Sequence, residues 1–293
     1  MNKPAGVFRI TDGDGMINLD SHSLRQLQLT ELELLQEADR VAKKYNISYC
    51  IIAGTMLGAV RHGGFIPWDD DVDIAMLRSE YERFREACKK ELDPQKFYFQ
   101  DHTVTAGYRW GYGKLRRKGS LFLREHQEHM PYEQGIFMDV FPLDPVPESQ
   151  WGRNLKNLEC FLVRKLLWAR VGKKADRSPW KRMLYAALDK IPETCILRYY
   201  NGMIERSKRC RSSWVRILMF PTPNASYGYL AKWYQGGEEI LFEGKPFPGV
   251  KDADEYLRFK FGDYMTLPSP EKRKVHPVSA FALPNSEKAR HDL

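Results

Sequence analysis

The sequence has no run of about 18 apolar residues, so we expect no membrane-spanning helix. Its opening segment, MNKPAGVFRITDGDG, also lacks the apolar stretch of a signal peptide. The 5 cysteines are scattered and form no CxxC pair, which argues against a zinc knuckle or a disulfide framework and favours a reducing cytoplasm. There is no internal repeat or low-complexity tract, and 29% charged with 43% hydrophobic residues is typical of a folded protein.

Charge is distributed unevenly along the 293 residues. Residues 1–140 carry 19 Lys and Arg against 21 Asp and Glu, whereas residues 151–216 carry 17 against 5, a net charge of +12. This basic segment fits an anionic membrane surface or a lipid-linked glycan. Nucleic acid fits less well, because no nucleic-acid motif is present and the acidic half would repel a polyanion. A solvated basic helical face with no partner remains the alternative.

The spacing of apolar residues predicts alternating helices and strands, and therefore an α+β fold with a mixed sheet. Helices are expected over 30–45, 79–92, 149–171, 179–209 (broken near Pro179 and Pro192) and 252–261. Strands are expected over 49–53, 72–76, 97–100, 112–117, 121–125, 135–141, 214–220 and 239–243. Capping boxes are expected to begin the first two helices, at Thr30 with Glu33 and at Ser79 with Glu82.

Two carboxylates stand at the start of the predicted strand 72–76. Residues i and i+2 of a strand share a face, so Asp71 and Asp73 project side by side while Val72 and Ile74 face the core. Adjacent carboxylates repel each other unless a cation lies between them, and Mg²⁺ prefers oxygen ligands and phosphate. The alternative for this acidic segment is a solvated turn.

A third carboxylate, Asp139, is the lone acid in the apolar segment 135–141. A buried unpaired charge is costly, and metal coordination would remove that cost. Three carboxylates converging from two strands could hold the metals that bridge the attacking and leaving oxygens of phosphoryl transfer. Asp139 could also accept the proton of an attacking hydroxyl, or it could be a structural residue bonded to backbone amides at the end of a strand.

The order of these features resembles the nucleotidyltransferase fold, in which a Gly-Thr turn precedes Asp-x-Asp and a later aspartate. Residues 54–74, GTMLGAVRHGGFIPWDDDVDI, are similar to the signature of LicD-type phosphocholine transferases, a family related to the fukutins. Residues 135–144 (GIFMDVFPLD) and 261–274 (FGDYMTLPSPEKRK) match later motifs, so the resemblance runs from about residue 25 to 277 and leaves the helical middle unmatched. The 15 residues between Thr55 and Asp71 exceed the gap in generic nucleotidyltransferases and suit the LicD branch.

The resemblance implies roles for particular residues. Asp71, Asp73 and Asp139 would be the catalytic carboxylates and would bind Mg²⁺ or Mn²⁺. Gly54 and Thr55 would hold the phosphates of the donor, where the glycine allows close backbone approach. We therefore expect a nucleotidyltransferase-like catalytic core over residues 1–145, a basic helical lobe over 146–215, and a C-terminal part over 216–293 that completes the core and ends in a loose tail after about residue 277.

The resemblance also implies a reaction. Phosphocholine would pass from CDP-choline to a sugar hydroxyl of a surface glycan, such as lipopolysaccharide or teichoic acid, with release of CMP. The acceptor would be a glycan or lipid-linked glycan at the cytoplasmic face of the membrane, so the protein is expected in the cytoplasm or at the inner membrane surface. Two alternatives stay open: transfer of ribitol phosphate or a nucleotide by the same fold, and a non-catalytic membrane- or nucleic-acid-binding module.

Further residues are candidates for binding the donor. Arg61 and His62 follow the phosphate-binding segment and could neutralise charge on the diphosphate. Lys114 and Arg116 alternate on a predicted strand, so both could face the site, and His276 could contact the nucleotide. A surface Arg–His pair, half-exposed strand cations and a histidine that caps a turn are the respective structural alternatives.

A choline donor also needs a place for its quaternary ammonium group. Aromatic faces attract such a cation by about 0.5–2 kcal/mol each. Trp68 borders the carboxylates, and Tyr108, Trp110 and Tyr112 alternate on one predicted strand, which makes Trp68, Trp110 and Tyr112 candidates. Ordinary core packing is the alternative for each.

Overall fold

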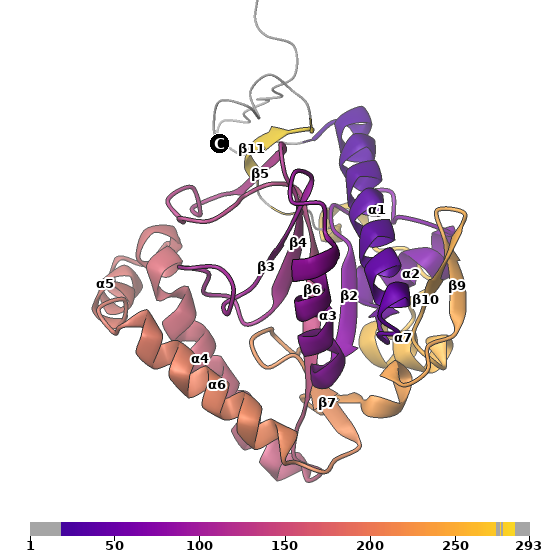
Figure 1. Cartoon of the computed structure of the whole chain (residues 1–293). Coiled ribbons are helices and arrows are strands. Elements are labelled where there is room, and N and C mark those ends of the chain that lie inside the picture. Colours follow the sequence, from indigo (N-terminus) through magenta and orange to yellow (C-terminus); the bar gives the residue numbers. More distant parts are fainter. Residues whose placement is uncertain (1–18, 274–275, 277, 285–293) are drawn as a thin grey trace, which may run out of the picture.

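The computed structural model describes residues 19–273, 276 and 278–284, which are built around a central mixed sheet (Figure 1). Its seven strands are β1 (Cys50–Ile51), β2 (Asp73–Leu77), β3 (Phe97–Gln100), β4 (Gly113–Arg117), β6 (Phe137–Pro145), β7 (Trp214–Arg216) and β8 (Tyr229–Leu230). They follow the order β1-β2-β6-β4-β3, with β7 paired to β6 and β8 to β7. The pair β2–β6 is parallel and the other pairs are antiparallel. The α+β class predicted from the sequence is confirmed.

Helices α1 (Ser21–Lys44) and α3 (Arg78–Glu91) cover one face of this sheet (Figure 1). Tyr81 and Phe84 of α3 pack against Phe99 of β3. Leu115 and Met138 are in register with Phe99 across the sheet, so they face the same helices. The alternate residues of these strands therefore face the opposite side, where the site described below lies.

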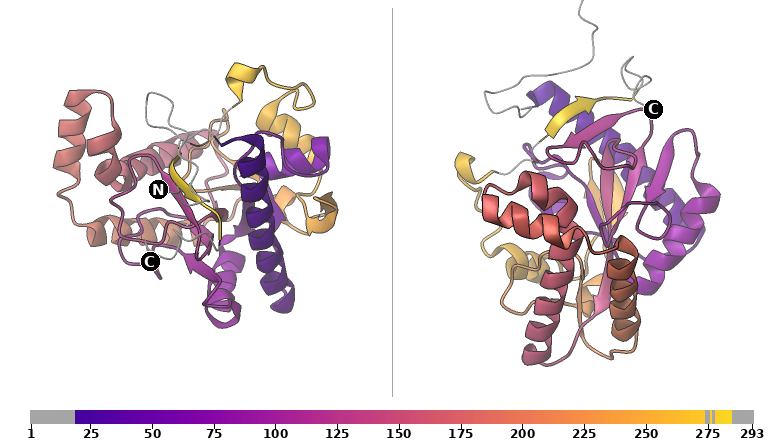
Figure 2. Two further views of the ribbon diagram at one scale, coloured as in Figure 1. Left: turned by 90° about the horizontal axis from the view of Figure 1, so that it is seen from above. Right: turned by 90° about the vertical axis from the view of Figure 1, so that its left-hand side faces the viewer.

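A helical lobe stands beside the sheet and consists of α4 (Gln150–Ala175), α5 (Pro179–Leu188) and α6 (Glu193–Lys208) (Figures 1 and 2). Helix α4 begins where Ser149 accepts a hydrogen bond from the backbone N–H of Gly152. The lobe has a small core of its own in which Cys160 and Leu167 of α4 face Tyr200 of α6. The predicted basic, mainly helical lobe is thus present in the fold.

The last part of the chain returns to the sheet on the side away from the lobe (Figure 1). It contains the 3₁₀ turns η1 (Ala231–Tyr234) and η2 (Pro270–Lys272), the hairpin β9 (Glu239–Phe242) and β10 (Lys245–Pro248), and α7 (Ala253–Phe261). Helix α7 packs against α2 (Ala53–His62), and Tyr256 Oη accepts a hydrogen bond from the backbone N–H of Ala53. Strand β11 (Val278–Ala282) pairs with β5 (Leu121–Arg124) in a separate two-stranded sheet.

Both predicted capping boxes are wrong. Helix α1 begins nine residues before Thr30, because Asp20 accepts a hydrogen bond from the backbone N–H of Ser23 at 2.7 Å. Thr30 lies inside the helix and donates to the carbonyl of Gln26. Helix α3 begins at Arg78, directly after β2, and no side chain caps it.

Three other expectations need correction. Gly54 and Thr55 form no turn but belong to the first turn of α2. Strand β6 does not end at Phe141 but continues through Pro142. Pairing between β6 and β4 ends at Val140, so the N–H that Pro142 lacks removes no hydrogen bond to β4. The tail expected after residue 277 begins instead with β11, and residues 285–293 lie outside the described residues.

No helix within the described ranges is both long and apolar enough to span a bilayer, in agreement with the expectation from the sequence.

Candidate active site

Three polar side chains form a row across the sheet, on the face turned away from α3. Asp73 of β2 is in register with Asp139 of β6, and Asp139 is in register with Lys114 of β4. Lys114 Nζ donates a hydrogen bond to Asp139 Oδ1 and lies 3.3 Å from the centre of the Phe137 ring. The sheet therefore brings together the two predicted carboxylates and the predicted cation.

The predicted orientation of Asp71 and Asp73 agrees with the burial of their neighbours. Val72 and Ile74 are fully buried, whereas the two aspartates are only partly buried. Burial, together with the charges of Asp71 and Asp139, raises the pKa of Asp73 well above its usual range. Burial and the charges of Asp70 and Asp139 raise the pKa of Asp71, although His276 and Arg124 oppose this effect. The carboxylates thus repel one another, as the sequence analysis expected.

The ammonium group of Lys114 is also buried. Burial lowers the pKa of Lys114 to about 7, although the Asp139 carboxylate opposes this shift. Asp139 is buried, and its partner is a side chain rather than the backbone amides of the structural alternative. Asp139 therefore points toward the same face of the sheet as Asp73.

Helix α2 fixes the position of the row formed by Asp73, Asp139 and Lys114, which we call the carboxylate row. Thr55 Oγ1 accepts a hydrogen bond from the backbone N–H of Asp73 at 2.8 Å, so the start of β2 is tied to the first turn of the helix. A Cβ on Gly54 would lie 2.7 Å from Asp69 Oδ2, which means that the glycine lets this carboxylate approach the helix N-terminus. Burial, and then the charges of Asp71 and Asp70, raises the pKa of Asp69 to about 8.

Two residues of the site, Lys260 and His276, come from the C-terminal part of the chain. Lys260 of α7 donates to Tyr229 Oη and is close enough to Asp73 for their charges to interact. His276 donates its backbone N–H to Asp70 Oδ2 at 2.8 Å, and its Nδ1 lies 3.1 Å from Asp70 Oδ1. These contacts join residues about 200 positions apart, which no local pattern reveals. His276 was a candidate, whereas Lys260 carried no signal.

A buried acid on α1, Glu31, was also missed. It is 2% exposed, and its Oε2 has no hydrogen-bond partner among the described residues. Burial and the neighbouring acidic charges, Asp71 foremost, raise the pKa of Glu31 well above its usual range. The signal for this residue was present, because a glutamate inside the apolar stripe of α1 breaks the amphipathic pattern.

Arg61, His62 and Trp68 lie together at the far end of α2. Arg61 Nη1 donates to the backbone carbonyl of Tyr264, and the rings of His62 and Trp68 are 6.4 Å apart. The guanidinium carbon of Arg273 lies 4.2 Å from the centre of the Trp68 ring. The face of Trp68 therefore already accommodates one cation of the protein.

Arg116 shares a face with Lys114 but makes contacts that anchor the sheet. It donates to Gln100 Oε1 and to the carbonyl of Gly135, both at 2.7 Å. Trp110 and Tyr112 belong to the loop before β4, and the Trp110 Nε1–H donates to Tyr132 Oη. A narrow cleft of about 70 Å³ is lined by Trp110, Tyr112, Lys114 and Arg116, and so four predicted donor residues share one space. Tyr108 is fully buried.

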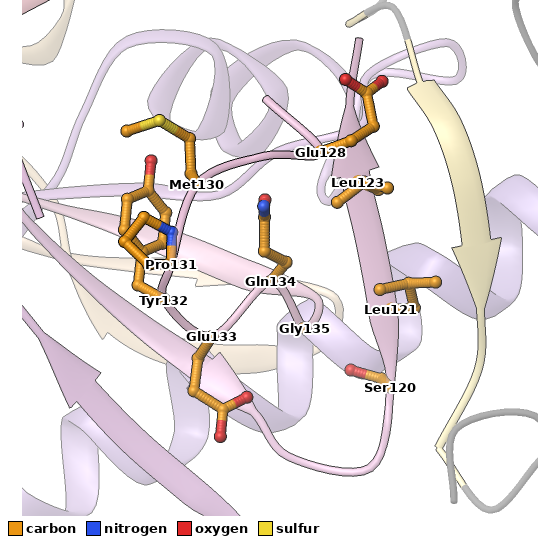
Figure 3. Close-up of a pocket in the computed structure, with 10 residues that line it drawn as sticks. All are labelled: Ser120, Leu121, Leu123, Glu128, Met130, Pro131, Tyr132, Glu133, Gln134 and Gly135. Atoms are coloured by element: carbon orange, nitrogen blue, oxygen red, sulfur yellow. The ribbon is translucent and has the colours of Figure 1, made fainter. Parts of the chain in front are cut away.

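A larger cavity of about 610 Å³ adjoins this cleft, between β5 and the segment 128–135 (Figure 3). Gln134 points into the space between that segment and Leu123, and it also lines the narrow cleft. Glu133 points away from Leu123 (Figure 3). The two cavities are thus neighbours along one surface that begins beside Lys114.

The donor set suits a divalent cation even though no three His, Cys, Asp or Glu side chains of the described residues are arranged to hold a metal ion. Asp139 is engaged by Lys114, which leaves Asp71 and Asp73 as the paired carboxylates. Magnesium is usually bound through one or two protein carboxylates together with substrate phosphates, so two are sufficient. The raised pKa values of both aspartates show the repulsion that a cation would relieve.

Comparison with known proteins gives three similarities. Residues 46–156 match a family model described as "LicD/FKTN/FKRP, nucleotidyltransferase domain". The chain is 27% identical over 266 residues to the lipopolysaccharide cholinephosphotransferase LicD of Haemophilus influenzae, covering 87% of this chain and 96% of that protein. It is 30% identical over 120 residues to an uncharacterised protein of Rickettsia prowazekii, covering 41% of each chain. The resemblance to the LicD family that the sequence indicated is thus confirmed, and the row of Asp73, Asp139 and Lys114 lies inside the matched region.

Proposed function

We propose that this chain, which matches the LicD-family nucleotidyltransferase domain over residues 46–156, transfers phosphocholine from CDP-choline to a sugar hydroxyl of a cell-surface glycan. The observation that carries the proposal is the row Asp73–Asp139–Lys114, with Asp71 close enough to both aspartates for their charges to interact. A module that only binds membranes or nucleic acid has no need of converging buried acids, whose repulsion destabilises the fold. The name of the Haemophilus relative supports phosphocholine as the group transferred and lipopolysaccharide as the acceptor.

The reaction balances as a single displacement at phosphorus. The sugar hydroxyl oxygen forms a bond to the phosphorus of the phosphocholine group, and the bond from that phosphorus to the bridging oxygen of CDP-choline breaks. The products are the phosphocholine-substituted sugar and CMP. The hydroxyl proton passes to Asp139, through the oxygen that Lys114 does not hold. Lys114 keeps that carboxylate oriented.

Asp71 and Asp73 would hold Mg²⁺ or Mn²⁺. When bound, such an ion neutralises the diphosphate and the charge that develops on the leaving oxygen. Gly54 and Thr55 at the N-terminus of α2 would lie beside the donor phosphates, where backbone N–H groups and the helix dipole favour negative charge. Arg61 is the nearest predicted cation along the same helix.

The choline group requires an aromatic face close to the carboxylates. Trp68 supports this role because Arg273 already lies over its ring, and Trp110 with Tyr112 lines the cleft beside Lys114. His62 and His276 lie close to Trp68 and Asp70 respectively, at the edge where the nucleotide would enter.

The direct test is a panel of CDP-linked donors, namely CDP-choline, CDP-ethanolamine, CDP-ribitol and CDP-glycerol, with release of CMP as the readout. We expect CMP release and transfer from CDP-choline, and loss of both in Asp71→Asn or Asp73→Asn with the circular dichroism spectrum retained. Turnover of CDP-ribitol alone would identify ribitol phosphate, and not phosphocholine, as the group that is transferred. Absence of CMP release from every donor would refute the proposal.

Metal dependence has a readout that does not require turnover. Added Mg²⁺ should raise the melting temperature of the wild type, because a ligand at 100 times its Kd stabilises a fold by about 2.7 kcal/mol. The double variant Asp71→Asn/Asp73→Asn should show no such shift. Full transfer activity in excess EDTA would contradict the metal part of the proposal.

The lobe would hold the protein beside a membrane that carries the acceptor. Apolar side chains at Trp151, Leu155, Leu158 and Leu162 form one exposed stripe along α4, with Trp151 at 72% exposure. Helix α5 packs against the C-terminal half of α4, where Gly172 allows close approach of the Tyr185 ring. Among the exposed residues of α5 are Trp180 and Met183, at 68% and 74%.

Cations next to this apolar surface favour an anionic bilayer as the partner. Lys174, Lys181 and Arg182 are exposed beside α5, whereas Lys173 is bonded to Asp189 and is not free. Each Lys or Arg near an anionic surface contributes about 1 kcal/mol, screened over about 10 Å at 0.1 M salt. Buried apolar side chains at the interface add to this attraction.

Sedimentation with vesicles tests this surface. Binding to vesicles of phosphatidylglycerol and phosphatidylcholine should fall with rising salt, and Trp180→Ala/Met183→Ala should weaken it. The exposed pair Lys89 and Lys90 on α3 provides a matched control when changed to Gln. Absence of binding at low salt, or a concentration-dependent dimer that the apolar variant abolishes, would refute the membrane assignment.

A further inference from the structure

The helical lobe forms one wall of a second cavity beside the carboxylate row. This cavity measures about 320 Å³ and lies between α4 and the loop that precedes β4. Trp110 and Tyr112 line it from the sheet side, and Arg164 and Trp168 line it from α4. Trp110, Tyr112 and Trp168 also line the narrow cleft that contains Lys114. The two spaces therefore share a wall, and the cavity adjoins the cleft that contains Lys114, the partner of Asp139.

Arg164, which lines this cavity together with Lys165, has no counter-ion among the described residues. No carboxylate in the described ranges is within ion-pair distance of Arg164, and its Nη1 is buried without a hydrogen-bond partner. Behind it lies Arg216, which is fully buried and close enough to Arg164 to lower its pKa, in addition to the larger effect of burial. A fully buried guanidinium group beside a partly buried one, with no acid next to them, is costly. An anion in the cavity would remove that cost through charge-assisted hydrogen bonds.

The rest of the lining is mainly aromatic, with Lys165, Met219 and Pro221 beside the rings. The ring centres of Trp110 and Trp168 are 5.8 Å apart at an angle of 46°, and Phe161 and Phe220 stand at the rim, both partly open to solvent. Flat aromatic side chains with a few charged groups suit a ligand that is apolar on one face and polar on its edge. A sugar ring carrying a phosphate or carboxylate has this combination.

We infer that this cavity binds an anionic sugar of the acceptor glycan, with its negative group on Arg164. The inference rests on the proposed function, in which the nucleotide lies at α2. Helix α2 and the lobe are on opposite sides of the central strands (Figures 1 and 2). Attack and departure at phosphorus are roughly in line, so an acceptor must approach from the side opposite the leaving CMP. The cavity of the lobe is on that side.

The test compares a phosphorylated lipopolysaccharide core oligosaccharide with the same oligosaccharide after phosphatase treatment. Binding is followed by tryptophan fluorescence, since Trp110 and Trp168 line the cavity. Arg164→Gln should lose about tenfold to a hundredfold in affinity for the phosphorylated probe and little for the treated one. Arg164→Lys should recover part of the loss. The acceptor KM should rise in Arg164→Gln while the CDP-choline KM stays unchanged.

The control is Lys190→Gln, which removes an exposed cation of the lobe outside the cavity and should behave as wild type. The melting temperature of Arg164→Gln should stay equal or rise, because an uncompensated charge is removed. Equal affinity of wild type and Arg164→Gln for the phosphorylated probe would overturn the inference and leave the proposed function intact. Loss of affinity for CDP-choline instead would assign the cavity to the donor. If the wild type transfers nothing from any donor, the proposed function itself has failed.

Discussion

Asp139 and Asp144 of the segment 135–144 should respond differently to substitution by Asn, because Asp144 belongs to a buried ion pair with Arg78. Arg78 Nε and Nη2 donate to the two carboxylate oxygens of Asp144 at 2.8 and 2.6 Å, and the side chains are 5% and 0% exposed. Burial disfavours the charged guanidinium, but the Asp144 carboxylate outweighs this effect and raises the pKa of Arg78 above its ordinary value. The guanidinium is therefore charged at neutral pH, and its bonds to Asp144 hold the start of α3 to the end of β6.

Asp144→Asn keeps the shape of the side chain but removes its charge and leaves Arg78 uncompensated. Breaking a buried pair in this way costs about 3–5 kcal/mol. One kcal/mol corresponds to about 2–4 °C in melting temperature for chains of about 150–250 residues. Taking the lower cost, we expect a fall of about 6–12 °C for Asp144→Asn.

Asp73→Asn should have the opposite effect on the chelated protein. The raised pKa of Asp73 means that its charge destabilises the folded state, so removal of the charge leaves the melting temperature equal or higher. The melting temperature of Asp139→Asn should lie between those of Asp144→Asn and Asp73→Asn, because this change removes repulsion from Asp73 but also removes the partner of Lys114. Thermal unfolding followed by circular dichroism in EDTA at about pH 8 measures all three. An Asp144→Asn protein as stable as wild type, or an Asp73→Asn protein that loses as much stability as Asp144→Asn, would refute this reasoning.

Three further predictions concern the frame of the site. Asp69→Asn should gain stability relative to chelated wild type between about pH 4 and about pH 8, because over that range the carboxyl of the wild type ionises in the unfolded chain but stays protonated in the fold. An unchanged difference across that range would contradict this prediction. Thr55→Val should cost about 1–3 kcal/mol and lower transfer by leaving the Asp73 N–H without its acceptor, whereas Thr55→Ser retains both in the same assays. Gly58→Ala should cost about 1–3 kcal/mol in urea unfolding, because its Cβ would collide with the backbone carbonyl of Gly64.

The carboxylate row was predictable because it depends on local rules. Period-two alternation puts Asp71 and Asp73 on one face, and a lone acid in an apolar strand must find a partner. The exact partner was not predictable, since it depends on register. Lys114 contacts Asp139 because β4 pairs with β6 in one particular alignment, and a shift by one residue would have turned Lys114 to the other face.

The predicted boundaries of helices were wrong where competing local signals were present. Thr30 with Glu33 fits a capping box, but Asp20 starts the helix earlier because Leu24 and Leu27 extend the apolar stripe toward the N-terminus. The Gly-Thr turn became a helix because Tyr256, about 200 residues later, satisfies the N–H of Ala53 at the start of α2. Tertiary contacts of this kind have no trace in the local sequence.

The site is assembled from three distant parts of the chain, and each supplies a different kind of group. The sheet contributes the acids, because register across β2, β6 and β4 can place charges in a row that one strand cannot hold. The C-terminal part brings Lys260 close to Asp73, where its positive charge opposes the repulsion among the acids, and it places His276 against Asp70. The middle of the chain contributes the cavity with Arg164. The basic segment that stands out in the sequence is thus divided: Lys174, Lys181 and Arg182 are exposed, while Arg164 is partly buried and lines the cavity.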